Sequence, residues 1–289
     1  MTLRDRLFVA LQYLWPQHAI SRAAHSVARV RAPWFKNALI GWVVRHFDVD
    51  MSEAADANPT SYDTFNSFFT RALRADARPL AAGEDAVLCP VDGAVSQAGH
   101  IDEQRIFQAK GHDFDLTTLL GGSAQRAAPF RGGRFATLYL SPRDYHRIHI
   151  PLAGRLLEMV YIPGRLFSVN AATTSAIPGL FARNERVVAI FETHAGPMAV
   201  VMVGAINVGS IETVWAGEIT PPRGKDVQTC IYSAAEGLEF ERGAEIGRFN
   251  IGSTVILAFG ADKVDWSAEL QPDATVRMGQ QIGRVIASP

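Results

Sequence analysis

The chain has 289 residues, which is room for one large domain or two ordinary ones. Apolar residues make up 48% and charged residues 20%, and this balance excludes a disordered chain and a polytopic membrane protein. The net charge of −1 argues against a nucleic-acid partner, and two cysteines, Cys89 and Cys230, are too few for a disulfide scaffold and indicate a reducing compartment.

The N-terminal segment differs from the rest of the chain in its charge. Residues 1–47 carry seven Lys and Arg against one acid, a net of +6, so the remaining residues sum to −7. An amphipathic helix is predicted by the helical spacing of Leu3, Leu7, Leu11 and Leu14. A second helix is expected to begin near Pro33.

Three of the five tryptophans fall in the same segment: Trp15, Trp34 and Trp42. Helices with arginine on one side and Trp or Leu on the other suit an anionic membrane surface. The alternative is that they pack on the protein's own core, which is the commoner fate of an amphipathic helix. No apolar run reaches the roughly 20 residues that span a bilayer. The run 7–15 is expected to be retained, with 1–47 attaching peripherally.

A third helical stretch is expected to follow Pro59, with Thr60 or Ser61 as its cap. After it, the sequence changes from helical to β-rich. Short β-rich runs alternate with Gly and Pro turns at 86–91, 94–98, 134–140, 147–150, 156–162, 187–194, 198–207, 210–216 and 254–259. No long helix separates these runs, so a doubly wound parallel sheet is excluded. We predict an α+β fold, in which N-terminal amphipathic helices (1–75) lie on a mostly antiparallel β-sandwich or barrel-like core (76–289).

Polar residues are concentrated between two of the β runs, at 141–151. Ser141 at an N-cap, with Asp144 three residues later, predicts the start of a one-turn helix. His146 would then end a turn and His149 would lie on the following strand, so the two histidines need not share a role. Although a His-x-x-His pair can bind a metal, no third ligand has a suitable spacing, and no metal is predicted.

Asp92 lies in a Pro-Val-Asp-Gly turn, where an aspartate is most often a turn residue. An aspartate that orients a histidine, which in turn deprotonates a hydroxyl, is nevertheless a recurring catalytic arrangement. Asp92 and a histidine are therefore a candidate general base, and the nucleophilic hydroxyl that this base would deprotonate has to come from another part of the chain. The hydroxyl of Ser253, which follows Gly252 at the start of a β run, is a candidate for that nucleophile.

Several longer motifs accompany these residues in a fixed order along nearly the full chain: 90–93, 139–151, 163–170, 183–187, 203–210 and 245–256. The last of them contains Gly252-Ser253-Thr254. With the basic, Trp-bearing N-terminus, this set resembles the bacterial phosphatidylserine decarboxylase proenzymes of the pyruvoyl type (type I). The one departure is Ile251, which stands where the family has leucine, and this conservative change leaves the cleavage motif intact.

The resemblance implies a decarboxylase that builds its own electron sink. The Ser253 hydroxyl would attack the carbonyl of Gly252, and β-elimination of the resulting ester would leave a pyruvoyl group at the new N-terminus. Residues 1–252 would become the β chain and 253–289 the α chain. This covalent pyruvoyl group, the only cofactor expected, would bind the substrate amine as a Schiff base.

The resemblance also implies roles for individual side chains. Asp92 and His149 would activate Ser253 for self-cleavage, and His146 would act in decarboxylation as the proton donor to Cα. Three residues of one turn would border the substrate: Phe167, Ser168 and Asn170. The alternative for this turn is that it packs beneath the site.

The expected reaction converts phosphatidylserine to phosphatidylethanolamine and carbon dioxide in phospholipid biosynthesis. It would take place on an anionic membrane surface, with the protein peripheral on the cytoplasmic side of the cell membrane. The α and β chains would remain associated, and a homodimer of the αβ unit is left open. Two alternatives remain. A pyruvoyl decarboxylase of a soluble amino acid has no use for a membrane face, and a barrel-sandwich carrier module needs a lysine at a hairpin tip.

Overall fold

The computed structural model describes residues 2–109, 111–206, 210–220, 225–250 and 252–287. Its first elements are four helices, α1 (Leu3–Leu14), α2 (Gln17–Ala28), α3 (Pro33–Phe47) and α4 (Phe65–Phe69). The predicted helices at α1 and α3 are confirmed, and α3 begins at the predicted proline, whose missing N–H has no helical partner to lose. Helix α2 was not predicted, although Ile20, Ala24 and Val27 recur at helical spacing within it.

The helical stretch predicted after Pro59 corresponds to α4, which begins later than its predicted cap. Its cap is Thr64, whose side chain accepts from the N–H of Ser67, while the Ser67 hydroxyl accepts from the N–H of Thr64. The cap predicted at Thr60 or Ser61 is therefore wrong. Both residues lie in a turn in which Asn58 accepts hydrogen bonds from Thr60, so this stretch satisfies its backbone without a helix.

The rest of the chain is mainly strands. In chain order they are β1 (Ala86–Leu88), β2 (Gly93–His100), β3 (Arg105–Ala109), β4 (His112–Asp115), β5 (Arg134–Tyr139), β6 (Arg147–His149), β7 (Gly154–Ile162), β8 (Arg186–Thr193), β9 (Gly196–Val203), β10 (Ile211–Thr213), β11 (Gly217–Glu218), β12 (Gln228–Ile231), β13 (Glu239–Phe240), β14 (Glu245–Phe249), β15 (Thr254–Phe259), β16 (Val264–Trp266), β17 (Thr275–Val276) and β18 (Gln281–Val285). Short helices lie between them: α5 (Leu116–Leu119), α6 (Ala124–Ala127), η1 (Ala128–Phe130), α7 (Ala171–Thr174), α8 (Leu180–Arg183) and η2 (Ala234–Glu236).

The strands form one large sheet and three small ones. The nine-stranded sheet has the order β12-β7-β8-β9-β15-β5-β2-β17, with β13 also on β7, and smaller sheets have the orders β11-β10-β14-β6, β1-β18-β16 and β3-β4. Each predicted β run contains a strand, and the strand pairs are antiparallel, which confirms the α+β fold. In the described residues the edge strands β12 and β17 do not pair with each other, so the barrel-like alternative is wrong and no barrel closes.

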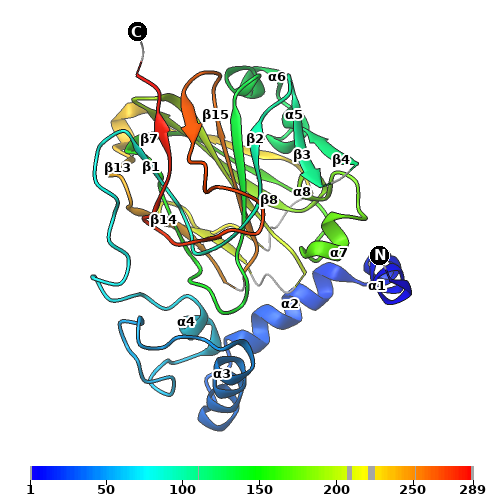
Figure 1. The fold of residues 1–289 in the computed structure, drawn as a ribbon. Coiled ribbons are helices and arrows are strands. Elements are labelled where there is room, and N and C mark those ends of the chain that lie inside the picture. The colour runs from blue at the N-terminus through cyan, green and yellow to red at the C-terminus, as the bar shows by residue number, and fades with distance from the viewer. Residues whose placement is uncertain (1, 110, 207–209, 221–224, 251, 288–289) are drawn as a thin grey trace.

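The N-terminal helices lie together along one end of the β core, away from the C-terminus (Figure 1). Two leucines of the predicted face of α1 point outward, since Leu7 is 62% and Leu14 79% exposed. On the opposite side of α1, buried Gln12 accepts a hydrogen bond from the N–H of Ser168 at 3.0 Å and so fastens the helix to the core. Among the described residues, no helix has both the length and the apolar character that crossing a bilayer requires.

Candidate active site

Ser253 lies immediately before β15, in the middle of the nine-stranded sheet. Its carbonyl accepts a hydrogen bond from the N–H of Leu140 at 2.8 Å, and the next residue, Thr254, pairs with strands on both sides. The Ser253 side chain is only 1% exposed, and its Oγ has no hydrogen-bond partner among the described residues. Burying a hydroxyl without a partner costs about 1–3 kcal/mol, so the backbone is held firmly while the hydroxyl is left free for another task.

Asn250, on the other side of the predicted cleavage bond from Ser253, is held by hydrogen bonds of its side chain and its backbone. Its amide nitrogen donates to Ser210 Oγ at 2.6 Å, and its Oδ1 accepts from the Asn66 side chain at 3.0 Å. Its backbone N–H donates to the Ser210 carbonyl at 2.9 Å. The sequence motif contains Asn250 but gave it no role, because partners so distant in sequence leave no local pattern. The predicted cleavage bond is therefore bracketed by the fixed residues Asn250 and Ser253.

His146 is fully buried against the segment that contains Ser253. The carbonyl of Asp144 lies 2.8 Å from Nδ1, and because a carbonyl only accepts, Nδ1 carries the proton and Nε2 carries a free lone pair. Nε2 has no partner among the described residues, and the ring of Phe69 packs on the imidazole with centroids 4.0 Å apart. Burial, with a smaller contribution from Arg71, lowers the pKa of His146 to about 3. The imidazole is therefore neutral at physiological pH.

The free nitrogen of His146 lies directly over Gly252. A Cβ built on Gly252 would be 1.9 Å from Nε2, a distance that only glycine avoids. The structure therefore brings together three of the predicted site residues, His146, Gly252 and Ser253. The helix predicted from Ser141 is wrong, since residues 141–144 form a single turn closed by Asp144, whose carboxylate accepts from the Ser141 N–H at 2.7 Å.

We expect Gly252→Ala to destabilise the protein, because the new methyl group would overlap the His146 imidazole. Overpacking of this kind typically costs about 1–3 kcal/mol in the free energy of unfolding. The double variant Gly252→Ala/His146→Ala should regain most of that loss, and urea unfolding would measure both. Gly99→Ala is the matched control, since its added Cβ would have no neighbour closer than 3.8 Å. Equal stability of Gly252→Ala and the unaltered chain would contradict the contact.

A cavity of about 380 Å³ opens beside His146, Gly252 and Ser253. Its other walls come from two helices, from the end of β5 and from three loop segments: Leu39, Trp42, Val43 and Phe47 of α3, Phe65 and Phe69 of α4, Tyr139 of β5, and Leu140, Pro142, Ser168, Val169, Ala205 and Ile206. Among the described residues, no Lys or Arg lines this cavity. It is an apolar chamber whose polar groups are concentrated at the Ser253 end, as ligand sites commonly are.

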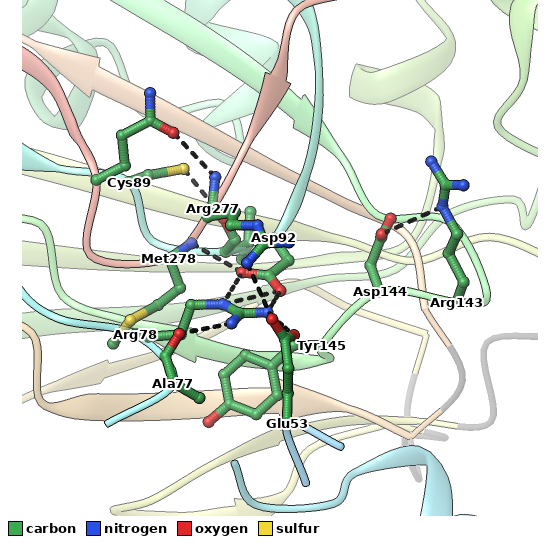
Figure 2. Close-up of polar contacts among 12 residues, drawn as sticks. Glu53, Ala77, Arg78, Cys89, Asp92, Arg143, Asp144, Tyr145, Arg277 and Met278 are labelled. Carbon is green, nitrogen blue, oxygen red and sulfur yellow. Dashed lines mark hydrogen bonds and ion pairs between the residues drawn. The ribbon is translucent and has the colours of Figure 1, made fainter. Parts of the chain in front are cut away.

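Asp92 lies in a different, polar cavity of about 220 Å³, in contact with Arg78 (Figure 2). Its Oδ1 accepts from Arg78 Nε at 2.9 Å and from the Met278 N–H at 2.8 Å, and its Oδ2 accepts from Arg78 Nη2. Arg78 also donates to Glu53 at 2.6 Å. Arg78 was not singled out from the sequence, because nothing in residues 76–80 marks an arginine whose partners lie elsewhere in the chain.

His149 lies on β6, and its ring is hydrogen-bonded on both sides. Nδ1 donates to the Gly243 carbonyl at 2.7 Å, which leaves Nε2 to accept from the Tyr145 hydroxyl at 3.0 Å. Burial lowers the pKa of His149. In the described residues no hydrogen bond joins Asp92 to His149, or either of them to Ser253, so their role in maturation stays a prediction.

The three residues predicted to border the substrate have different positions. Ser168 lines the cavity that contains Ser253, whereas Phe167 is fully buried behind it. Asn170 caps α7 and lines a neighbouring cavity of about 400 Å³. Within the described parts of the chain, no three His, Cys, Asp or Glu side chains converge as metal ligands.

Comparison with known proteins gives a consistent result over nearly the whole chain. The family model described as phosphatidylserine decarboxylase matches residues 65–284, and a second, described as PSD, matches 7–48. A phosphatidylserine decarboxylase proenzyme of Stutzerimonas stutzeri (strain A1501) is 57% identical over 98% of this chain and 95% of its own length. Proteins of the same name from Ectopseudomonas mendocina (strain ymp) and Azotobacter vinelandii are each 56% identical, over 97% and 98% of this chain and 99% of their own lengths.

Proposed function

Because the chain belongs to the phosphatidylserine decarboxylase family, we propose that it converts phosphatidylserine to phosphatidylethanolamine and carbon dioxide after cutting itself at Gly252–Ser253. The relatives are named proenzymes, which agrees with a chain that must be processed. The observation that carries the proposal is that the buried, unpartnered Ser253 hydroxyl and the free lone pair of His146, which lies over Gly252, belong to one cavity.

The residues around Ser253 fit a pyruvoyl group formed from that serine. The hydroxyl has no hydrogen-bond partner among the described residues, and the preceding residue, Gly252, has no side chain to crowd the bond against His146. Such a group supplies a ketone that withdraws the electron pair left on Cα of the substrate's serine headgroup when carbon dioxide departs. The two neighbouring strands of β15 hold residue 253 in place while this chemistry proceeds.

His146 is proposed to move the proton that the reaction requires. After carbon dioxide leaves, Cα of the substrate must receive one proton. Because Nδ1 is bonded to the Asp144 carbonyl, only Nε2 can carry that proton to Cα. The apolar walls around His146, which include Phe69, exclude water that would otherwise compete for the proton.

Asp92 and His149 are proposed to act as one unit in maturation. The N–H of His149 donates to the carbonyl of Pro90 at 2.9 Å, which ties β6 to the turn that carries Asp92. Tyr145 supports the link, because its hydroxyl contacts His149 and its side chain lines the cavity of Asp92. For His149 to accept the Ser253 proton, Nε2 must first release Tyr145.

We expect Asp92→Ala and His149→Ala each to accumulate the uncut chain. The double variant should be little slower than the slower single variant, as is usual for groups that act together. The rate constant of chain cleavage after synthesis, followed on denaturing gels, is the measurement. Asp265→Ala, which breaks an ion pair of an exposed carboxylate with Arg134, is a control that should be cut normally. Rate losses that simply multiply would mean that the two residues act separately.

We propose that the two products of cleavage remain associated. Strand β15, which would belong to residues 253–289, lies between β5 and β9 of the other chain and is paired with both along its whole length. Strand β18 pairs with β1 in the same way. Extracting the shorter chain would break these ladders and expose a buried strand, so only denaturant should separate the two.

We propose that residues 1–47 attach the protein to the membrane surface. The outward side of these helices carries Leu7, Leu14 and Trp34, of which Trp34 is 78% exposed. Trp42 is half exposed and also lines the cavity of Ser253, so a lipid could pass from the surface to the site along α3. The net charge of +6 favours anionic lipids.

The expected behaviour is that of a peripheral protein. Alkaline carbonate should release it from membranes, and high salt should release it only in part, because insertion of apolar side chains survives screening. Sedimentation with vesicles that contain anionic lipid measures both, with zwitterionic vesicles as the control. Retention after carbonate would contradict peripheral attachment.

One experiment tests the proposed function as a whole. Mass spectrometry of the purified protein should find two chains, with a blocked N-terminus on the shorter one, and a lipid assay should find phosphatidylethanolamine formed from phosphatidylserine. Two chains that act on a free amino acid instead would favour the soluble-substrate decarboxylase. A single uncut chain without lipid decarboxylation would overturn the proposal and leave the carrier-module alternative.

A further inference from the structure

Two arginines converge on one buried aromatic ring next to the active-site cavity. The guanidinium carbons of Arg165 and Arg183 lie 5.5 Å and 5.0 Å from the ring centre of Phe167. Tyr13 of α1 packs on the same ring, 5.1 Å from centre to centre, and Arg183 also lies 5.7 Å from the Tyr13 ring. The Phe167 ring is fully buried, while both arginines are exposed, so the two cations lie between the ring and the solvent.

Neither arginine has an acidic partner among the described residues. Within the described parts of the chain, one hydrogen bond leaves the two guanidinium groups, from Arg165 to the carbonyl of Tyr13 at 3.1 Å. Arg126, by contrast, forms a bidentate ion pair with Glu158. Two unneutralised guanidinium groups on one ring repel each other unless an anion lies between them. The arrangement is therefore suited to an external anion.

The position of the pair relative to Ser253 indicates which anion this is. Ser168, the residue after Phe167, lines the cavity that contains Ser253, and Gln12 fastens α1 to Ser168. The cavity has no Lys or Arg lining of its own among the described residues. A phosphatidylserine whose amine reaches residue 253 carries its phosphodiester only a few bonds away. That negative charge must therefore be met by cations just beyond the lining, and Arg165 and Arg183 lie on the ring of the residue before Ser168.

We propose that Arg165 and Arg183 bind the phosphodiester of the lipid substrate. The planar, forked guanidinium matches phosphate oxygens, and stacking on Phe167 fixes the orientation of each fork. The α1 helix contributes by placing Tyr13 beside them, and this helix belongs to the segment that we propose attaches to the membrane surface. The inference rests on the proposed function, because it assumes a phospholipid whose amine reacts at residue 253.

The test compares Arg165→Gln, Arg183→Gln and their double variant in micelles of a neutral detergent that contain phosphatidylserine. Neutral micelles remove the general attraction between a basic protein and an anionic surface. We expect KM in the double variant to rise about tenfold or more, with kcat within about twofold, as the loss of a charged hydrogen bond predicts. Lysine at both positions should restore part of the affinity. Arg284→Gln, which removes an exposed arginine on β18, far from α1, should leave KM unchanged.

A second arm does not depend on turnover. Short-chain phosphatidylethanolamine carries the phosphodiester but no carboxylate, and its binding to Ser253→Ala by calorimetry should weaken when both arginines are replaced. This arm reports on the arginines even if the protein decarboxylates nothing, so failure of the proposed function is recognised separately. An unchanged KM and unchanged binding would overturn the inference. It would also be overturned if only attachment to anionic vesicles fell, since the arginines would then serve the membrane surface and not the substrate.

Discussion

Ser253→Ala is expected to remain a single, uncut chain with no detectable decarboxylase activity. The alanine has no hydroxyl to attack the Gly252 carbonyl, and without cleavage the chain cannot form a ketone at residue 253. Because the whole electron sink is lost, the effect should reach the full rate enhancement, which for enzymes is about 10⁶-fold or more. Intact mass and formation of phosphatidylethanolamine measure the two consequences.

A matched control for this variant is Thr137→Val. Thr137 lies on β5, beside β15, and its buried hydroxyl likewise has no partner among the described residues. Valine has nearly the same shape, so the variant removes a buried hydroxyl without touching the cleavage bond, and it should be cut as the unaltered chain is. If Ser253→Ala still yielded two chains divided at residue 252, the proposed mechanism would be wrong.

His146→Ala is expected to be cut and yet to turn over slowly. A positioned proton donor typically contributes about 10²–10⁴-fold, and His146 is the group in contact with Gly252 whose nitrogen is free to carry the proton. The experiment purifies the variant, confirms two chains, and measures kcat for phosphatidylethanolamine formation. An uncut variant would move His146 into maturation, and a cut, fully active one would make it structural.

The buried state of His146 also has a consequence for pH. Because burial lowers the pKa of this histidine from 6.5 to about 3, the neutral ring contributes stability that is fully present above pH 6.5. That contribution is lost as the pH falls toward 3, where the folded protein must also accept the proton. Ser253→Ala should therefore lose stability across this range, and Ser253→Ala/His146→Gln should lose less. Parallel curves for the two proteins would mean that His146 is not held neutral.

The comparison between His146 and His149 shows why spacing alone did not distinguish their surroundings. Both were placed correctly from the sequence, one after a turn and one on a strand. Each histidine has one local partner, but its other contacts come from distant parts of the chain: Gly252 and Phe69 for His146, and Gly243 for His149. A pattern within eleven residues carries information about local backbone, and none about which distant loop the fold brings to each ring.

The N-terminal helices show the same limit in a different form. Leucine spacing predicted α1, and Pro33 predicted the start of α3, because helical period and a proline at the first turn are local properties. Whether the leucines of α1 face the core or the outside is a property of packing. The buried contact between Gln12 and the Ser168 backbone turns that helix so that Leu7 and Leu14 lie outward.

The sequence by itself determined most helices and strands of this protein and predicted its reactive bond, since helical period, β alternation and the motif around Ser253 are properties of neighbouring residues. Only the tertiary structure decided which side chains meet. Asp92 pairs with Arg78 and the backbone of Met278, 186 residues further on, and Arg165 and Arg183 share the ring of Phe167. Such contacts depend on how strands from distant segments are ordered in a sheet, and the free energy that orders them comes from burying the whole core.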